Sequence, residues 1–166
     1  MFDGWKLCPR CGSQLTHGAE VVVCPACGFS LYAHSAVTAS ALPEDGEGRV
    51  LLARRAVEPS RGLWDLVGGF LSEGEHPLDG LRREVLEETE LEFEPGQYLG
   101  LWMGEYDGRA TLNLFWTGRF RSGEPHASDD VAELRWFAAR DLPAADELAF
   151  DPLVEDVLRA WRNEHA

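Results

Sequence analysis

The segment "GGFLSEGEHPLDGLRREVLEETEL" (residues 68–91) constrains the fold more than any other, because it joins a glycine pair to a helix crowded with carboxylates. Seven of its 24 residues are acidic. Pro77 suits the first turn of a helix, and the pattern predicts a helix over 76–91. Like charges at neighbouring helical positions are destabilising. Either this acidic face is merely solvated, or it binds something cationic.

The helical repeat places Glu84, Glu87 and Glu88 within an arc of about 100° on one face. Converging carboxylate oxygens are the ligands that hard divalent cations prefer. An apolar stripe beside them is suited to packing on a sheet, and it consists of Leu78, Leu81 and Val85. The helix therefore predicts a divalent cation site on the face next to its buried stripe.

Three residues around this helix are predicted to support the cation site. Arg83 lies one turn before Glu87, so that an i,i+4 ion pair orients the Glu87 carboxylate. Gly68 and Gly69 let the backbone pass close to a metal ion, and the carbonyl of Gly68 is a further candidate ligand.

Two cysteine pairs, "CPRCG" and "CPACG", predict a second metal site near the N-terminus. Four thiolates close a tetrahedral zinc site with no open position, which makes it structural. So small a segment needs the metal for its stability. The alternative is two redox or disulfide pairs, but a redox dithiol normally accompanies a βαβ unit. We expect one Zn²⁺ in a ribbon over residues 1–32, bound by Cys8, Cys11, Cys24 and Cys27.

The remainder of the chain predicts a second domain over 33–166. Its order of strands and helices, β, β, β, α, β, β, β, α, indicates a mixed sheet covered by helices, in the α/β class. The expected strands are 35–42, 48–57, 63–70, 98–106, 110–120 and 132–139, and a closing amphipathic helix covers 151–164.

Charge and hydropathy exclude several classes of protein. A net charge of −14 argues against a surface that binds nucleic acid through phosphate contacts. No apolar run is long enough to span a bilayer, so no membrane partner is expected. The first residues lack the pattern of a signal peptide, so the cytoplasm is the expected location. The sequence leaves open whether the chain forms a homodimer.

The acidic helix resembles the signature of the Nudix hydrolases. The matching positions are Gly69, Glu75, Arg83, Glu84, Val85, Glu87, Glu88 and Leu91. One position departs, since Glu90 stands where the signature has its last glycine. That glycine commonly takes a left-handed conformation at the helix end. A glutamate there costs about 1 kcal/mol, or else the helix ends differently.

The resemblance extends over most of the chain, including "GLW" before the glycines, "DDVAELRWF" and "DLP". With its ribbon, the chain is similar to the Nudix branch that includes NADH pyrophosphatases. The resemblance implies an α/β/α sandwich and a pyrophosphohydrolase that depends on two or more Mg²⁺ or Mn²⁺ ions. It also implies that Asp130 occupies the place of a metal-binding carboxylate near the late strand.

The predicted site residues follow from the helix and the resemblance together. The Mg²⁺ or Mn²⁺ ligands are Glu84, Glu87, Glu88, Asp130 and the Gly68 carbonyl. The catalytic group is Glu75, Arg83, Glu84 and Glu87. The general base stays open between Glu87 and a loop acid, either Asp129 or Glu133.

The predicted substrate is a nucleotide in which a nucleoside diphosphate is linked to another moiety. Arg54 or Arg55 is expected to bind a phosphate, and strand alternation lets only one of them face the site. Trp102 and Tyr106 are candidates for stacking on a base. The hairpin turn "DGR" carries Arg109 toward a terminal phosphate or ribose, or else leaves it exposed in solvent.

The branch's Ser-Gln-Pro-Trp stretch is missing after the acidic helix, which weakens the case for NADH. ADP-ribose or a related dinucleotide is therefore the first candidate, and a (deoxy)nucleoside triphosphate is the second. A Nudix-fold ligand sensor without catalysis is a third reading. Such sensors tend to lose the carboxylates of the signature, and this chain keeps them.

Overall fold

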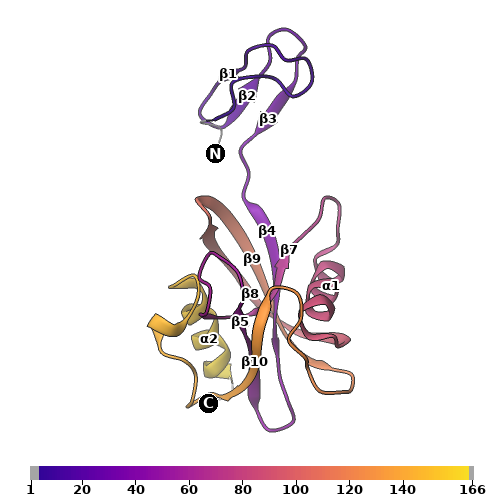
Figure 1. Cartoon of the computed structure of the whole chain (residues 1–166), viewed down its shortest axis with the longest axis vertical. Coiled ribbons are helices and arrows are strands. Elements are labelled where there is room, and N and C mark those ends of the chain that lie inside the picture. Colours follow the sequence, from indigo (N-terminus) through magenta and orange to yellow (C-terminus); the bar gives the residue numbers. More distant parts are fainter. Residues whose placement is uncertain (1–3, 165–166) are drawn as a thin grey trace. The chain divides into compact units, whose positions relative to one another are not determined.

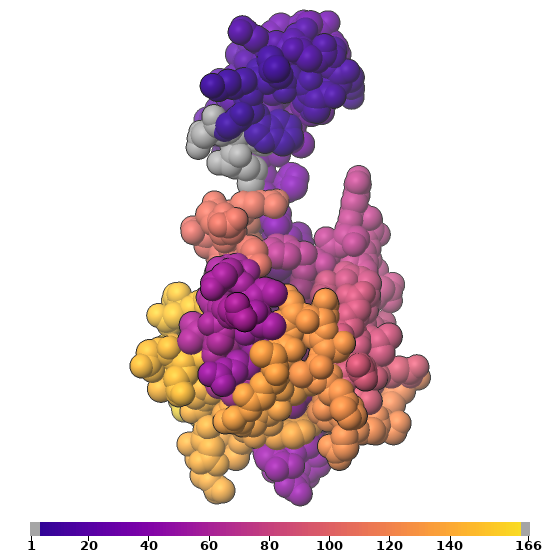
Figure 2. Space-filling view, viewed as in Figure 1, coloured from indigo at the N-terminus to yellow at the C-terminus, as the bar shows by residue number. Residues whose placement is uncertain are grey.

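The computed structural model describes residues 4–164 and divides into two compact units. One unit ends at Ser35 and the other begins at Ala36. Both are drawn in Figure 1 and, as space-filling atoms, in Figure 2. Each unit is compact, and each is described by itself below.

The N-terminal unit is a three-stranded antiparallel sheet in the order β1-β2-β3. Two matching turns flank it: the amide of Gly12 donates to the Cys8 carbonyl at 2.9 Å, and the amide of Gly28 donates to the Cys24 carbonyl at 2.9 Å. Both glycines have positive φ, which turns each Cys-X-X-Cys segment back on itself. The strands are β1 (Thr16–His17), β2 (Val21–Val23) and β3 (Ser30–Tyr32).

The second unit is built on a four-stranded sheet in the order β7-β4-β9-β8. The pairing of β4 with β9 is parallel and the other two pairings are antiparallel, so the predicted mixed sheet is confirmed. The strands are β4 (Ala36–Pro43), β7 (Val67–Phe70), β8 (Phe93–Tyr106) and β9 (Arg109–Phe120).

A smaller antiparallel sheet and two helices complete this unit. The sheet has the order β10-β5-β6, and the two long helices lie on opposite sides of the sheets in Figure 1, as in an α/β/α sandwich. No helix among residues 4–164 is long and apolar enough to cross a membrane. The remaining elements are β5 (Arg49–Arg55), β6 (Trp64–Asp65), α1 (Pro77–Thr89), β10 (Val131–Ala138), the 3₁₀ helix η1 (Ala145–Glu147) and α2 (Leu153–Glu164).

Strands β4 and β5 bury residues on both of their faces, and each helix covers one of the two resulting cores. Leu81 and Val85 of the apolar stripe on α1 are fully buried in a cluster with Ala39, Ala41 and Val67. On the other side, α2 contributes four buried apolar side chains to a cluster with Leu42 and Phe115: Val154, Val157, Leu158 and Trp161. Burying a side chain of this size stabilises the fold by about 1.5–3 kcal/mol.

The segment 63–70 differs from the single strand that the sequence predicts. Asp65 pairs with Ala53 in the small sheet, whereas Val67 pairs with Ala41 in the large one. The chain therefore changes sheets at the buried Leu66. Apolar residues lie on both sides of this switch, at Trp64 and Val67, so sequence periodicity alone does not reveal it.

Strand β8 begins at Phe93, five residues before the predicted start at 98. Its first part pairs with the end of β9 across two irregularities, between Pro95 and Tyr98 and between Tyr98 and Gly100. Proline and glycine normally argue against a strand, but at bulges the missing amide and side chain are tolerated. The strand pattern of the sequence is interrupted at these bulges, although the strand itself continues through them.

Helix α1 ends at Glu90 in the left-handed conformation, with φ 60° and ψ 16°. The Glu90 amide donates to the Leu86 carbonyl at 2.9 Å, so the helix closes as it would with a glycine. The sequence left open whether the helix ends differently or the glutamate adopts the left-handed conformation, and the structure shows the second. The strain costs about 1 kcal/mol.

We predict that Glu90→Gly stabilises the protein by about 0.5–1 kcal/mol, because glycine adopts a positive φ without a steric penalty. In a chain of this size the melting temperature should rise by about 2–4 °C per kcal/mol. Glu90→Ala is the matched control, since it removes the same charge but keeps a side chain at positive φ. Equal melting temperatures for the two variants would show that the helix end carries no strain.

Candidate functional site

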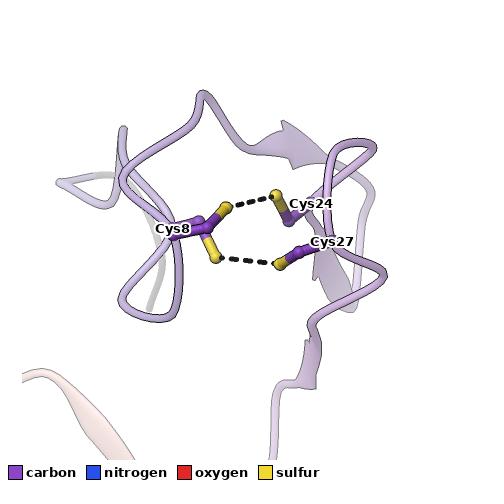
Figure 3. A group of neighbouring side chains, drawn as sticks. Cys8, Cys24 and Cys27 are labelled. Carbon is purple, nitrogen blue, oxygen red and sulfur yellow. Dashed lines mark hydrogen bonds between the residues drawn. The ribbon is translucent and has the colours of Figure 1, made fainter.

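The four cysteines meet in one cluster between the two glycine turns of the N-terminal unit (Figure 3). The Sγ atoms of Cys8 and Cys27 lie 3.6 Å apart, as do those of Cys11 and Cys24. All four sulfurs lie within 4.8 Å of one another, and none of the four forms a disulfide. This spacing suits four ligands around one tetrahedral ion.

Cys11 and Cys27 differ in how readily their thiols ionise. Hydrogen bonds from Ser13 lower the pKa of Cys11 to about 6. The pKa of Cys27 rises to about 12 despite a backbone hydrogen bond from Phe29, because burial and the neighbouring thiols favour its protonated form. Four thiolates this close together repel one another unless a cation neutralises them, so the cluster fits a Zn²⁺ ion.

In the second unit, a cavity of about 230 Å³ opens between the large sheet, the small sheet and α1. One guanidinium, that of Arg55, faces into it. Opposing this single positive charge are six carboxylates: Asp65, Glu84, Glu88, Glu105, Asp129 and Asp130. The charge imbalance makes the cavity strongly attractive to cations.

The glycine pair of β7 lets α1 come close enough to place its carboxylates in this cavity. Oε2 of Glu88 accepts a hydrogen bond from the Gly68 amide at 2.9 Å. A Cβ on Gly69 would lie 2.5 Å from Oε2 of Glu84, and one on Gly68 would collide with the Ala39 carbonyl on β4. A side chain at Gly69 would therefore displace the Glu84 carboxylate, and one at Gly68 would disturb the pairing of β7 with β4.

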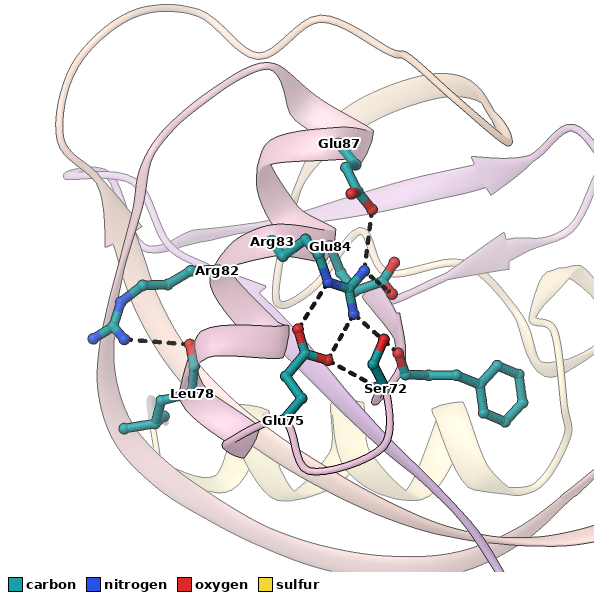
Figure 4. Close-up of polar contacts among 8 residues, drawn as sticks. Ser72, Glu75, Leu78, Arg82, Arg83, Glu84 and Glu87 are labelled. Atoms are coloured by element: carbon teal, nitrogen blue, oxygen red, sulfur yellow. Dashed lines mark hydrogen bonds and ion pairs between the residues drawn. The ribbon is translucent and has the colours of Figure 1, made fainter.

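Arg83 holds three carboxylates with one guanidinium (Figure 4). Nε and Nη2 donate to the two oxygens of Glu75, each at 2.9 Å, and Nη2 also donates to the Phe70 carbonyl at 3.1 Å. Nη1 donates to Glu84 at 2.7 Å and to Glu87 at 3.2 Å. Arg83 and Glu75, predicted as catalytic, thus face each other as a two-pronged ion pair whose geometry orients Glu84.

This ion pair is stable over the whole ordinary pH range. Hydrogen bonds from Arg83, and one from the Ser72 amide, lower the pKa of Glu75 to about 2. The same contacts raise the pKa of Arg83 above its already high value. Because neither partner changes charge between pH 4 and pH 9, the loop before α1 stays fixed to the helix.

The pKa values of two carboxylates that face the cavity are raised, in contrast to that of Glu75. Burial raises the pKa of Glu88 well above its usual value, even though the carboxylate accepts a bond from the Gly68 amide, and Asp130 adds to the effect. Burial likewise raises the pKa of Glu84, against the opposing influence of Arg83. Carboxylates this poorly solvated are stabilised by a divalent cation, so their chemistry fits the predicted Mg²⁺ or Mn²⁺.

The structure places three of the four predicted carboxylate ligands, Glu84, Glu88 and Asp130, around the cavity. The loop carrying Asp130 lies against the end of α1, where Ser128 donates to the Glu88 carbonyl at 3.1 Å (Figure 1, Figure 2). The fourth, Glu87, is not among the lining residues, and its half-exposed carboxylate is held by Arg83.

Among residues 4–164, only the four cysteines bring three or more potential ligand atoms within 4.8 Å of one another. The carboxylates surround the cavity, but no three of their oxygen atoms among the described residues lie that close together. Of the candidate general bases, Asp129 lines the cavity. Glu133 does not, because it pairs with Arg54 at 3.5 Å and with Arg135 on the surface of the small sheet.

Strand alternation separates the two arginines at the end of β5. Arg54 points outward, where Nε donates to the Gly62 carbonyl at 2.7 Å. Arg55 lines the cavity, and Nε donates to the Pro59 carbonyl at 2.8 Å. The structure thus favours Arg55 over Arg54 as the group that meets a phosphate.

Asp65 is a site residue that sequence reasoning missed. Its carboxylate accepts from Nη1 of Arg55 at 3.2 Å and from the Leu66 amide at 2.8 Å. Burial raises the pKa of Asp65, whereas Arg55 opposes the shift. A lone carboxylate inside the apolar run "LWDLVGG" was the available signal, since buried acids are rare unless they are paired.

Of the two residues predicted to stack on a base, only one lines the cavity. Tyr106 lines the cavity, whereas Trp102 does not and packs edge-to-face on the core residue Phe115 at 5.5 Å. Phe150, from the loop before α2, was not predicted. Its ring lies 5.5 Å from that of Tyr106 and 4.9 Å from the guanidinium carbon of Arg55. The two rings give the cavity an aromatic wall beside its arginine.

The NUDIX domain family matches residues 34–157 of this chain. The chain is 32% identical over 139 residues to an ADP-ribose pyrophosphatase of Methanocaldococcus jannaschii, covering 81% of this chain and 79% of that protein. It is 27% identical over 142 residues to the NAD-capped RNA hydrolase NudC of Stutzerimonas stutzeri. That match covers 84% of this chain but spans only half of the NudC protein.

A crystal structure of a NUDIX hydrolase from Nitrosomonas europaea has a similar fold. It superimposes with a TM-score of 0.83, covers 96% of this chain and 91% of that one, and is 25% identical in sequence. A match over 96% of the chain extends into both units.

We predict that the purified protein contains one zinc ion per chain, and that a chelator strong enough to remove it unfolds the cysteine unit alone. Metal analysis together with thiol titration gives the stoichiometry. Cys24→Ser should make the residues before Ser35 sensitive to protease while the unit after Ala36 keeps its melting transition. Four freely reactive thiols in a zinc-free, protease-resistant protein would contradict this site.

We also predict that Glu88→Gln removes most of the stabilisation that Mg²⁺ gives to the protein. Without cation the variant should be at least as stable as wild type, because glutamine removes a buried charge and keeps an oxygen for the Gly68 amide. With Mg²⁺ the melting temperature of wild type should rise and that of the variant should rise less.

Thermal melts with and without Mg²⁺ provide this measurement. Glu94→Gln, which changes an exposed carboxylate on β8, is the control and should respond like wild type. An undiminished Mg²⁺ response in Glu88→Gln would mean that the acidic face of α1 is only solvated.

Proposed function

Because this chain belongs to the NUDIX family, we propose that it is a metal-dependent pyrophosphohydrolase that cleaves a nucleoside diphosphate linked to a second moiety, with ADP-ribose as its first substrate. As a NUDIX hydrolase it acts on phosphoric anhydride bonds. The observation that carries the proposal is the cavity in which Glu84, Glu88 and Asp130 face Arg55.

The cation ligands in this proposal are Glu84, Glu88 and Asp130, with the Gly68 carbonyl and Glu87 as further candidates. In this proposal these ligands bind two or more Mg²⁺ or Mn²⁺ ions. When bound there, such ions would neutralise the charge of the diphosphate and would make the attacking water more acidic. The buried carboxylates with raised pKa values support this assignment, since a cation relieves their mutual repulsion.

The protein's own residues bind and orient the reactants. Arg83 keeps Glu84 in place, and Arg55, positioned by Asp65, binds a phosphate oxygen. Water adds to one phosphorus, the bridging P–O bond breaks, and the water's proton passes to a carboxylate that is not occupied as a ligand. The candidates for this base are Glu87, which Arg83 holds outside the cavity, and Asp129, which lines it. The products are two phosphate monoesters.

The choice of ADP-ribose rests on two observations. The cavity has an apolar wall that suits an adenine ring, formed in part by Tyr106, Phe115 and Phe150. The relative that is 32% identical is named an ADP-ribose pyrophosphatase, and the match spans most of both chains. The NudC relatives carry less weight because this chain spans about half of their length.

The zinc site is assigned a structural role in the N-terminal unit, because four cysteine ligands leave no position for a substrate. Reduced cysteines that bind zinc are typical of a reducing compartment, which supports the cytoplasm as the proposed location.

We predict that the protein with Mg²⁺ or Mn²⁺ converts ADP-ribose to AMP and ribose 5-phosphate, and that NADH is a poorer substrate. A panel of nucleotides analysed by chromatography identifies the products, and ¹⁸O water locates the attacked phosphorus. Glu88→Gln should lose roughly 10²-fold or more in turnover, as expected when a preorganised charge is removed.

Release of pyrophosphate from nucleoside triphosphates, without cleavage of ADP-ribose, would replace the proposed substrate with the triphosphate. Binding of nucleotides without any turnover would instead identify a NUDIX-fold sensor.

A further inference from the structure

A second cavity, of about 170 Å³, adjoins the carboxylate cavity at the end of the large sheet. It is lined by Ala36, Phe70, Tyr106, Asp107 and Arg109. Phe70 and Tyr106 also line the carboxylate cavity, so the two spaces share part of a wall. We call the smaller space the second lobe.

The second lobe is built on rigid backbone. Tyr106 and Arg109 are directly paired across β8 and β9, on either side of the two-residue turn Asp107-Gly108. Both turn residues have positive φ, 48° and 71°, as in the tight turns that hold hairpins in register. The ring of Phe70 meets that of Tyr106 edge-to-face, with centroids 5.1 Å apart. Little reorganisation is therefore needed to bind a ligand here.

The polar groups of the second lobe are not satisfied by the protein. Among residues 4–164, neither the Asp107 carboxylate nor the Arg109 guanidinium makes a side-chain hydrogen bond or an ion pair, and both side chains are exposed. Most arginines elsewhere in this unit have an acidic partner, as Arg49, Arg83 and Arg121 do. Arg109 thus keeps all its donors available.

We propose that the second lobe binds the sugar attached to the far phosphate of the substrate, with Asp107 accepting hydrogen bonds from its hydroxyls and Arg109 donating to them. This inference rests on the proposed diphosphate substrate. One carboxylate beside one guanidinium presents both acceptors and donors at no net charge, which suits a neutral polyhydroxylated group. A further phosphate would be repelled by Asp107. The faces of Phe70 and Tyr106 suit the C–H side of a sugar ring.

The position of the second lobe fits a group joined directly to the diphosphate. Gly68, at the carboxylate cavity, and Phe70, at the shared wall, are two residues apart on β7, a distance of about 7 Å along the strand. A diphosphate bound through cations at Glu84 and Glu88 therefore places its next group beside Phe70. The adenosine occupies the aromatic end of the carboxylate cavity, next to Phe150.

The test compares Arg109→Gln and Asp107→Asn with wild type on two substrates. One is ADP-ribose, and the other is ADP esterified with a methyl group on its terminal phosphate, which has the same diphosphate but no second sugar. Asparagine tolerates the positive φ of position 107, so the hairpin is preserved. Arg119→Gln, an exposed arginine at the opposite end of β9, is the matched control for loss of charge.

For Arg109→Gln we expect KM for ADP-ribose to rise roughly 10-fold, as for loss of a charge-assisted hydrogen bond, with kcat within about twofold of wild type. Asp107→Asn should act in the same direction. KM for the methyl ester should stay unchanged in both variants, and Arg119→Gln should match wild type on both substrates.

An equal rise in KM for the two substrates, or none for either, overturns the sugar assignment while the proposed function stands. If wild type cleaves neither diphosphate, the proposed function falls and the second lobe falls with it. The wild-type reactions alone distinguish these two failures.

Discussion

The Arg83 guanidinium is the interaction on which the rest of the site depends. It spans the carboxylates of Glu75, Glu84 and Glu87 and reaches the backbone carbonyl of Phe70. Without this positive charge, α1 would carry uncompensated acids next to the buried edge of the sheet. With it, the loop, the helix and β7 become one rigid unit. Glu84 is then fixed in position before any cation or substrate binds.

A second constraint is the space that the backbone leaves for these carboxylates. Gly69 leaves room for the Glu84 carboxylate against β7, and the amide of Gly68 donates a hydrogen bond to Glu88. Just upstream, the chain changes sheets at Leu66, so that Asp65 and Gly68 lie on different sheets yet line one cavity. The cavity therefore lies where the two sheets diverge, and Arg55 enters it from β5 of the small sheet, beside Asp65.

Local signals were sufficient wherever one element carried all the information. The acidic face and apolar stripe of α1, the alternation of most strands and the doubled Cys-X-X-Cys spacing all depend on short-range periodicity or turn geometry. Glu84 and Glu88 could thus be predicted as cavity residues. The same reasoning included Glu87, because helical angle does not reveal that Arg83 holds this carboxylate outside the cavity.

The sequence by itself determined the mixed α/β fold, the cysteine cluster and the carboxylates of α1, because each follows from the periodicity of a single segment. Only the tertiary structure decided between Arg54 and Arg55, separated Tyr106 from Trp102, and brought Asp65 and Phe150 to the site. Those choices depend on which sheet a strand joins and where it bulges. Strand pairing between distant segments sets both, and no short stretch of sequence records such pairing.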